Sequence, residues 1–475
     1  MRLRTSYFAL ILLTLPIPLP AQPAVSPAER RLAEFVEVVS SADPERLRTM
    51  VQQSFATEFR DAFPIDSHLE ILAGLARETG GIEVADVQMR SPNVLTAQVR
   101  PRNGSPPLSV QLRIEPEPPH RIAGIGVRPA EGPRPAPAAT PAEAAQRLRA
   151  HVDSLAAADR FSGVVLLEKG GEILLHDAWG QAEKAFGAPN RPDTKFNLGS
   201  MNKMFTAVTV ARLVEDGRLA LDDGIGKYLG PEWLEPGIGD RVTIEHLLTH
   251  TSGLGSYYSP ELMELNPGRF RQIDDFQEIV RRDSLAFEPG TRWSYSNTGF
   301  LLLGAIVEKV TGRSYYDVVR ELVYEPAGMT GTDAYMFDAP TPNLAVGYER
   351  EGEEWRSNAY GHVARGGPAG GGYSTAPDLL AFARAIRENK LLSPEMTRRV
   401  TTPKPEIGAP EYGYGFGFWE DGRVVGHTGG APGINAALQI DTERGWTVVV
   451  MSNYGQAAIP VVRYADALLG YADER

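Results

Sequence analysis

The sequence predicts an α/β (α+β) sandwich, an antiparallel sheet flanked by helices, which follows a smaller α+β domain. The first observation is length, because 475 residues exceed what one hydrophobic core usually supports. The second is a change of period near the N-terminus, where helical spacing gives way to alternating strands. The third is that strand patterns recur at both ends of the remaining chain, around a largely helical middle. Strands from both ends imply one antiparallel sheet.

The N-terminal segment has the layout of a secretory signal peptide. Arg2 and Arg4 precede an apolar run from Tyr7 to Leu19, and Ala21 offers a small residue for cleavage. The run is short and broken by prolines, which argues against a spanning helix, although an uncleaved anchor is the alternative. No later stretch is long and apolar enough to cross a bilayer. We expect residues 1–21 to be a signal peptide and the protein to be secreted or periplasmic.

Residues 24–128 form the expected small domain. Capping signals at Ser26 and Asp43 open two helices, and the period then switches to strands. The expected helices end near Val39, follow Asp43 and span Ile65–Thr79, and the strands span Ile82–Met89, Val94–Val99, Leu108–Ile114 and Arg121–Val127. Helices followed by a meander of strands resemble the cone-shaped NTF2-like domains. No functional site is visible in this domain.

A Pro- and Ala-rich linker over residues 129–141 leads to a larger domain over residues 142–475. This domain begins with a helix near Pro141–Ala157 and a hairpin whose Gly170-Gly171 pair suits a primed turn. The hairpin strands are expected at Phe161–Glu168 and Glu172–Ala178, and later strands at Val424–His427, Ile434–Ile440 and Trp446–Ser452, before a closing helix at Ile459–Leu469.

Composition excludes several classes of function. The chain has no cysteine, which removes thiol nucleophiles, thiolate metal sites and disulfides. Its formal charge of −12 repels phosphate backbones, so nucleic acid is not an expected partner. We expect a small-molecule or peptide substrate, no cofactor and no metal ion.

The first candidate motif is Ser200-Met201-Asn202-Lys203, at the start of a predicted helix over Ser200–Glu215. A spacing of three places Ser200 and Lys203 on one helix face. A hydroxyl becomes a useful nucleophile when a base takes its proton, and a desolvated lysine is such a base. The Ser200 N–H, unpaired at a helix start, is suited to hold an oxyanion. The simpler alternative is a helix-capping serine.

The second motif is Tyr295-Ser296-Asn297, in a loop that leads to a predicted helix over Gly299–Val310. A neighbouring ammonium favours a phenolate, so Tyr295 near Lys203 is a candidate general base that later returns the proton to the leaving group. Asn297 would orient Lys203 and a substrate carbonyl. Taken alone, the pair could equally be a buried tyrosine beside a turn asparagine.

The third motif is His427-Thr428-Gly429-Gly430, expected to follow a strand that ends at Gly426. Glycines at a strand end let a substrate backbone lie along the edge, and the Gly430 N–H would complete an oxyanion hole with that of Ser200. An ordinary turn is the alternative explanation.

With these three motifs in this order, residues 142–475 resemble the serine β-lactamase/penicillin-binding superfamily, in its class C-like branch of DD-peptidases and esterases. The resemblance extends to Thr243–Leu254, to Phe287–Gly290 and to Gly370–Thr375. It implies a mixed α/β sandwich with an all-helical lobe. It also implies that Ser200 is the acylated nucleophile and that Lys203 and Tyr295 transfer the proton. Asn297, His427, Thr428 and Gly429 would line the site.

One position departs from the common pattern of that superfamily. Many members have lysine where this chain has His427, and lysine is a permanent cation suited to a substrate carboxylate. Histidine is mostly neutral at pH 7. The substitution argues against an efficient β-lactamase, and His-Thr-Gly occurs in related peptidases and hydrolases.

Two further patterns are better explained by local structure. His246 and His250 have the spacing of a zinc peptidase motif, but Leu247 replaces the required glutamate, so a helix end entering a turn is expected. Ser374 lies in a near match to a nucleophile elbow, but Thr375 and Pro377 indicate a helix start. The glycines of Gly366–Gly372 fit a loop near the active site.

The sequence therefore predicts an exported serine hydrolase that forms an acyl-enzyme at Ser200, with an ester or a D-amino-acid-containing peptide as substrate. The alternatives are a class C-like β-lactamase and a catalytically silent peptide- or penicillin-binding protein. Loops such as Tyr257–Arg271 and Ala339–Gly367 are expected to select the substrate.

Overall fold

The computed structural model describes residues 25–471 except 61–64, 105–106, 131–134, 260–261, 263, 352–353, 408, 410–411 and 420–421. The predicted signal peptide lies outside the described residues. The chain divides into two compact units, residues 1–133 and 134–475, which we call the N-terminal unit and the second unit. Of the helices in the described part of the chain, none combines the length and the apolar composition needed to cross a bilayer.

The N-terminal unit packs helices on one four-stranded antiparallel sheet of order β1-β2-β3-β4. Its elements are α1 (Pro27–Ser41), α2 (Pro44–Ser54), α3 (Thr57–Arg60), α4 (Ile65–Thr79), β1 (Ile82–Ser91), β2 (Val94–Pro101), β3 (Leu108–Ile114) and β4 (Ile122–Pro129). The capping box predicted at Ser26 is present, and Asp43 caps α2 as expected. The helices and strands predicted here are confirmed, and the likeness to NTF2-like domains stays a prediction.

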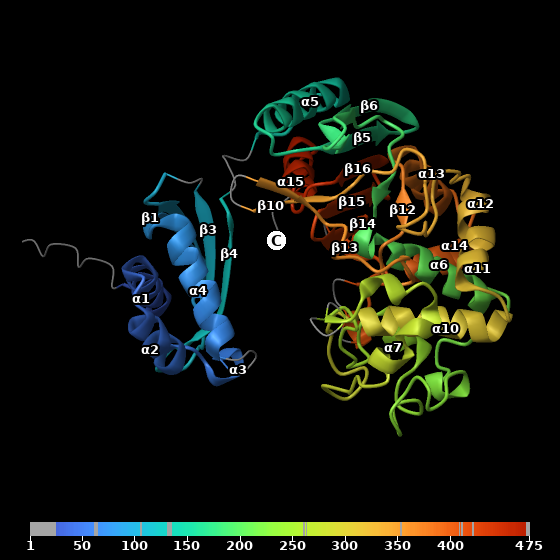
Figure 1. The fold of residues 1–475 in the computed structure, drawn as a ribbon, viewed down its shortest axis with the longest axis horizontal. Coiled ribbons are helices and arrows are strands. Elements are labelled where there is room, and N and C mark those ends of the chain that lie inside the picture. The colour runs from blue at the N-terminus through green and yellow to red at the C-terminus, as the bar shows by residue number, and fades with distance from the viewer. Residues whose placement is uncertain are drawn as a thin grey trace, which may run out of the picture. The chain divides into compact units, whose positions relative to one another are not determined.

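The second unit is built on a six-stranded antiparallel sheet of order β13-β14-β15-β16-β5-β6 (Figure 1). Its strands are β5 (Gly163–Lys169), β6 (Glu172–Trp179), β13 (Gly417–Trp419), β14 (Val424–Ala431), β15 (Ile434–Asp441) and β16 (Trp446–Ser452). Strands from both ends of the unit meet where β16 pairs with β5, Val450 opposite Val165. This pairing confirms the predicted single antiparallel sheet.

Helices cover both faces of this sheet. The helices α5 (Pro141–Ala157) and α15 (Ala458–Leu468), from opposite ends of the unit, share one hydrophobic core with one face. A larger core on the other face joins the sheet to α6 (Asn202–Glu215), α10 (Asn297–Thr311) and α13 (Ala376–Arg387). These layers confirm the predicted α/β sandwich.

The middle of the second unit is mainly short helices. They are η1 (Gly199–Met201), η2 (Ile225–Lys227), α7 (Ile244–Leu248), η3 (Pro267–Arg269), η4 (Ile273–Phe276), α9 (Gln277–Val280), α11 (Tyr315–Val319), η5 (Arg320–Tyr324), α12 (Glu325–Ala327), α14 (Pro394–Val400) and η6 (Pro405–Ile407). Small strand pairs, which the sequence did not predict, join β7 (Gln181–Glu183) to β8 (Ala188–Pro189), β9 (Phe196–Asn197) to β12 (Tyr373–Ser374), and β10 (Tyr348–Glu351) to β11 (Glu354–Ser357).

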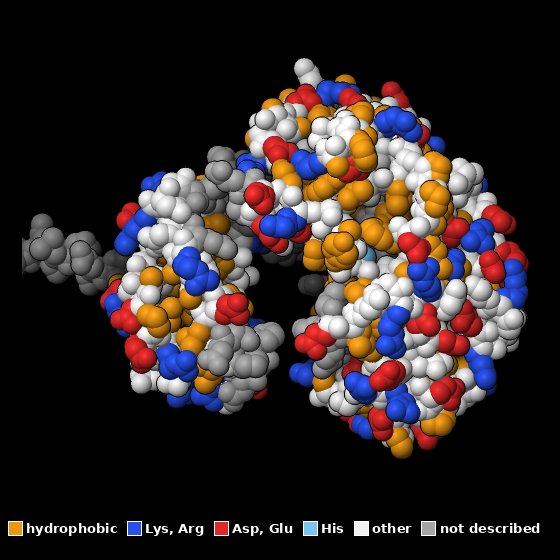
Figure 2. Space-filling view, viewed as in Figure 1, with side chains coloured by type: hydrophobic (Ala, Val, Ile, Leu, Met, Phe, Trp, Pro, Cys, Tyr) orange, Lys and Arg blue, Asp and Glu red, His pale blue; other side chains and the backbone are white. Residues whose placement is uncertain are grey.

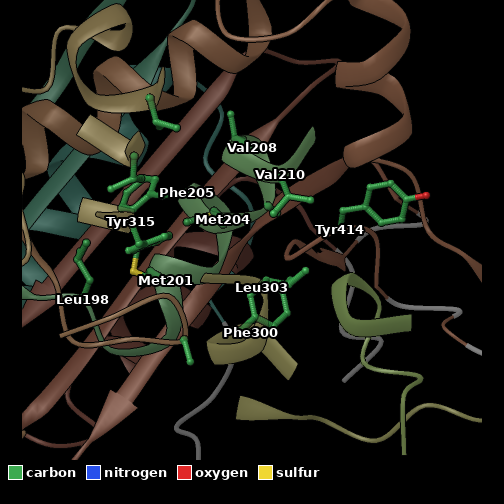
Figure 3. Close-up of a cluster of buried hydrophobic side chains, with 14 of the residues drawn as sticks. Leu198, Met201, Met204, Phe205, Val208, Val210, Phe300, Leu303, Tyr315 and Tyr414 are labelled. Atoms are coloured by element: carbon green, nitrogen blue, oxygen red, sulfur yellow. The ribbon is translucent and has the colours of Figure 1, made fainter. Parts of the chain in front are cut away.

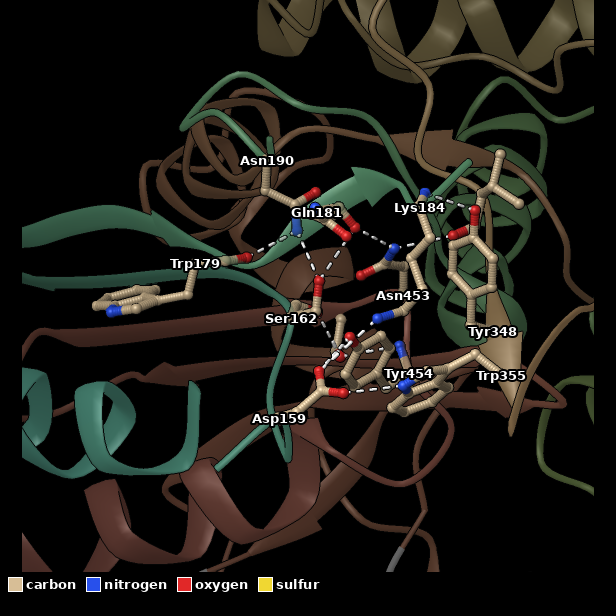
Figure 4. Close-up of polar contacts among 12 residues, drawn as sticks. Asp159, Ser162, Trp179, Gln181, Lys184, Asn190, Tyr348, Trp355, Asn453 and Tyr454 are labelled. Carbon is tan, nitrogen blue, oxygen red and sulfur yellow. Dashed lines mark hydrogen bonds and ion pairs between the residues drawn. The ribbon is translucent and has the colours of Figure 1, made fainter. Parts of the chain in front are cut away.

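A polar and aromatic cluster anchors the β10–β11 hairpin to the sheet (Figure 4). Asp159 accepts hydrogen bonds from Trp355 Nε1 at 2.8 Å and from the Tyr454 hydroxyl at 2.7 Å. The Lys184 ammonium lies 4.5 Å from the Trp355 ring and 4.9 Å from the Tyr454 ring. These contacts hold β11 in place, and the chain continues from β11 to the glycine-rich residues 366–372.

Candidate active site

Ser200 lies in the single turn η1, directly before α6. The side chains of Met201 and Met204 point into the core, as do those of Phe205 and Val208 (Figure 3). Ser200 itself remains half-buried. The predicted helix start is thus a 3-10 turn that continues into α6, and the buried side chains that follow Ser200 hold this turn in place.

Lys203 is fully buried one turn after Ser200. Its Nζ donates hydrogen bonds to Asn297 Oδ1 at 2.8 Å and to the main-chain oxygen of Ala369 at 2.6 Å. Burial holds the pKa of Lys203 well below its usual range. An amine that uses two N–H groups in this way keeps a lone pair for a proton when it is neutral.

Tyr295 is brought to the same place by the loop before α10. The Lys203 Nζ lies 4.7 Å from the centroid of the Tyr295 ring. Burial raises the pKa of Tyr295, and a hydrogen bond with the Ser200 side chain opposes this rise. At neutral pH Tyr295 is therefore a protonated phenol, which differs from the phenolate that a neighbouring ammonium would have favoured.

Asn297 is the first residue of α10, and Ser296 caps that helix by accepting from the N–H of Gly299 at 2.9 Å. The cap directs the Asn297 side chain to Lys203 through Oδ1, while Nδ2 donates to Ser256 Oγ at 2.9 Å. The structure therefore brings Ser200, Lys203, Tyr295 and Asn297 together.

The His427–Gly430 motif lies beside Ser200, but its secondary structure was predicted wrongly. We expected a strand that ends at Gly426 or His427, whereas β14 continues through the motif to Ala431 and pairs with β15 throughout. β13 pairs only with Val424–Gly426. Beyond Gly426, no strand in the described part of the chain pairs with the opposite edge of β14, so that edge is open next to η1.

Glycine is required where β14 meets η1. A Cβ atom on Gly429 would lie 1.8 Å from the Leu198 carbonyl oxygen. A Cβ atom on Gly199, whose φ is +50°, would lie 2.9 Å from the nitrogen of Gly430. The close approach places the N–H-bearing backbone of Gly430 next to the turn that carries Ser200. Thr428 is half-buried on the same stretch of strand.

His427 is buried, and its Nδ1 contacts the Thr428 oxygen while its Nε2 has no hydrogen-bond partner among the described residues. Burial lowers the pKa of His427 to about 3. At neutral pH this position therefore carries no positive charge.

The glycine-rich segment 366–372 borders the site, as the sequence predicted. Besides the Ala369 contact with Lys203, Gly367 O accepts a hydrogen bond from Asn202 Nδ2 at 3.1 Å. A Cβ atom on Gly370 would lie 3.0 Å from Gly199 O. Hydrophobic side chains gather on the face of the second unit over β12–β14, with charged side chains around them (Figure 2).

The two patterns that the sequence analysis set aside have structural roles. Helix α7 ends at Leu248, and His246 Nδ1 accepts from the Thr243 N–H at 3.2 Å. Ser374 is buried in β12, and Thr375 caps α13 as predicted. Within the described ranges, no group of three or more His, Asp or Glu residues lies close enough to hold a metal ion.

Sequence reasoning missed three residues of the site. Ala369 and Ser256 contact Lys203 and Asn297 respectively. His250 packs against Tyr295 with ring centroids 4.4 Å apart. His250 lies in Thr243–Leu254, which carried part of the family resemblance without any assigned chemistry, and Ala369 lies in the glycine-rich loop expected near the active site, whereas Ser256 lies in neither segment.

A serine beside a buried lysine and a tyrosine, at the edge of an antiparallel sheet, defines a serine hydrolase of the β-lactamase/penicillin-binding type. The chain belongs to the Beta-lactamase family, whose model matches residues 148–470.

Relatives within this class differ in their named activities. The chain is 34% identical over 313 residues to Esterase EstB of Burkholderia gladioli, covering 58% of this chain and 79% of that protein. It is 31% identical over 341 residues to a D-aminopeptidase of Gluconobacter oxydans (strain 621H), covering 69% of this chain and 63% of that protein. A crystal structure of a penicillin-binding protein from Bacillus halodurans matches with a TM-score of 0.62 and 30% identity, covering 67% and 99% of the respective chains.

Proposed function

We propose that this protein is an exported serine hydrolase that forms an acyl-enzyme at Ser200, with an ester or a D-amino-acid-containing peptide as substrate. The observation that carries the proposal is the surroundings of Lys203. The amine is fully buried, hydrogen-bonded to Asn297 and Ala369, and next to a tyrosine that contacts Ser200. An ammonium group buried only for structural reasons would need a carboxylate, whereas a proton acceptor needs this neutral state.

The first half of the reaction forms the acyl-enzyme. Ser200 Oγ attacks the substrate carbonyl carbon, and its proton passes to the Lys203–Tyr295 pair. Because Tyr295 is protonated and Lys203 is neutral, Tyr295 takes the serine proton as it releases its own, and Lys203 gains the charge. The N–H groups of Ser200 and Gly430 hold the oxyanion.

The second half returns the proton and releases the product. The pair protonates the leaving alcohol or amine as the carbonyl re-forms, which leaves Ser200 esterified. Water then attacks the acyl-enzyme, the pair takes the proton of the water, and Ser200 recovers a proton as the acid leaves. Each proton that the pair receives is returned, so the enzyme is regenerated unchanged.

The substrate class follows from His427. A neutral imidazole at this position provides no permanent cation for the carboxylate of a β-lactam, which argues against an efficient β-lactamase. An ester that lacks this carboxylate does not need a cation at position 427. The esterase and D-aminopeptidase names of the relatives support these two substrate classes.

A panel of three substrates tests the proposal, with Ser200→Ala as the matched control. We expect hydrolysis of a p-nitrophenyl ester or a D-alanyl-D-alanine peptide, weak hydrolysis of nitrocefin, and none by the variant. Nitrocefin as the best substrate would favour a β-lactamase, and binding of a fluorescent penicillin without turnover would favour a silent binding protein.

Export is proposed on the N-terminal sequence. N-terminal sequencing of the protein recovered from the periplasm or culture medium is expected to begin near Gln22. A protein that retains Met1 in the cytoplasm would contradict the proposal.

A further inference from the structure

His250 lies directly against Tyr295, inside the core of the second unit. Its side chain has no solvent exposure. The two ring planes are inclined by 24° with their centroids 4.4 Å apart, so the rings are stacked. Phe300 contacts the same imidazole with its centroid at 5.0 Å, and Tyr412 does so at 5.3 Å. The imidazole therefore restricts the plane of the tyrosine ring.

His250 also holds the backbone on both sides of Tyr295. The N–H of Ser294 donates to the main-chain oxygen of His250 at 2.8 Å. The N–H of Ser296 donates to His250 Nδ1 at 3.0 Å. One residue thus contacts the residue before Tyr295, the Tyr295 ring and the residue after it.

The Ser296 contact also determines the form of the imidazole. Because a backbone N–H donates to Nδ1, this nitrogen carries no proton, and the neutral ring has its hydrogen on Nε2. Burial holds the pKa of His250 well below its usual range. Nε2 has no hydrogen-bond partner among the described residues, so the imidazole acts through its stacked face on Tyr295 and through the hydrogen bond between Nδ1 and Ser296.

We propose that His250 is a positioning residue, which holds the Tyr295 phenol in the direction that lets it exchange a proton with Ser200. The inference rests on the proposed function, in which Tyr295 passes that proton. Its contribution appears in the rate of acylation and not in substrate binding, because His250 touches Tyr295 rather than the substrate.

Two variants separate the two contacts. His250→Asn keeps an acceptor for Ser296 and tolerates the left-handed φ of +59°, but it removes the stacked ring. His250→Phe keeps a ring and removes the acceptor. We expect each variant to lower kcat for a p-nitrophenyl ester by about 10- to 100-fold, the scale of a small misplacement of a reacting group, with KM nearly unchanged.

His246→Asn is the matched control. His246 makes the same kind of hydrogen bond, from the Thr243 N–H to Nδ1 at 3.2 Å, four residues away. We expect this variant to change the melting temperature without changing kcat. Circular dichroism supplies the folded fraction by which every rate is corrected.

The decisive step repeats His250→Asn in a Tyr295→Phe background. If His250 acts through the phenol, its loss costs less than about threefold once the phenol is gone, because effects of coupled residues are not additive. The inference would be overturned if His250→Asn lowered kcat as much in the Tyr295→Phe background as in the native protein. It would also be overturned if both His250 variants kept native kcat, or if His246→Asn lost as much kcat as they do. Native kcat for Tyr295→Phe alone would overturn the proposed role of Tyr295 and this inference with it.

Discussion

Lys203 and Ser200 are three residues apart, yet they differ completely in exposure. Ser200 is half-buried at the open edge of β14, whereas Lys203 is fully buried and contacts only neutral oxygens through hydrogen bonds. Burying a charged amine in this way would be costly, so the folded protein holds it neutral. The buried lysine that the proposed reaction uses therefore lowers the stability of the folded protein.

Lys203→Met tests that cost. In the unfolded chain the Lys203 amine is protonated at any pH below its usual pKa, whereas in the folded protein it stays neutral at the same pH. Protonation of Lys203 therefore favours the unfolded state as the pH falls. We expect the unfolding free energy of the native protein, relative to the variant, to rise by about 1.4 kcal/mol per pH unit between pH 7 and 9. Denaturant titrations of both proteins at pH 7 and pH 9 measure this difference. If the difference in unfolding free energy were the same at both pH values, Lys203 would be charged in the folded protein. The variant is also expected to lose acylation activity by about a hundredfold or more.

His427→Lys tests the role of charge at the other side of the site. A cation at this position is expected to bind a substrate carboxylate and raise the ratio of kcat/KM for nitrocefin to that for a p-nitrophenyl ester by about tenfold or more. His427→Gln, which adds no charge, is the control. An unchanged ratio in the lysine variant would mean that His427 does not meet the substrate carboxylate.

For individual residues, the sequence predicted the side chains of the site but not the main-chain groups that contact them. The nucleophile motif and the Tyr295–Asn297 motif predicted four side chains that the fold brings together. The Ala369 oxygen that holds Lys203 left no signal, because any residue has a carbonyl. His250 was judged only as a possible metal ligand, since its contact with Tyr295 depends on two loops meeting.

Among the elements, β14 decides how the site is arranged. Its glycines have weak strand preference, which explains why the sequence predicted an end at Gly426. Pairing with β15 carries the strand on to Ala431, and the absence of Cβ atoms lets Leu198 and Gly199 approach it. Tertiary contact, which a local pattern does not contain, overrides the local preference here.

Gly429→Ala measures this contact. The added methyl group would overlap the Leu198 oxygen, so η1 or β14 must move, at an expected cost of about 1–3 kcal/mol in unfolding free energy and a loss of ester hydrolysis. Gly430→Ala is the comparison for stability, because its Cβ atom would meet only Asn435 Nδ2 at 3.9 Å. Equal stability of the two variants would contradict the packing described here.

For the whole molecule, the two units have separate hydrophobic cores. Residues of the N-terminal unit, such as Phe35, Leu95 and Leu112, form one cluster, and the second unit contains two others on either side of its sheet. The order of the longer helices and strands in both units followed from the sequence, because burial of one face imposes a strong period. The small strand pairs were missed, because strands of two to four residues are too short to show a period.

Residues 134–475 expressed alone test the independence of the second unit. Because every residue assigned to the site belongs to this unit, we expect the fragment to fold and to hydrolyse the ester within about twofold of the full chain. The comparison uses kcat/KM and the melting temperature of both proteins. A fragment that is folded but inactive would show that the N-terminal unit contributes to catalysis.

The measurement that tests the central claim most directly is acylation of Ser200 by a fluorophosphonate, followed by intact-protein and peptide mass spectrometry. We expect one adduct per chain, on the peptide that contains Ser200, and none in Ser200→Ala. Labelling of Ser200→Ala at the native rate, or an adduct on another residue, would contradict the account.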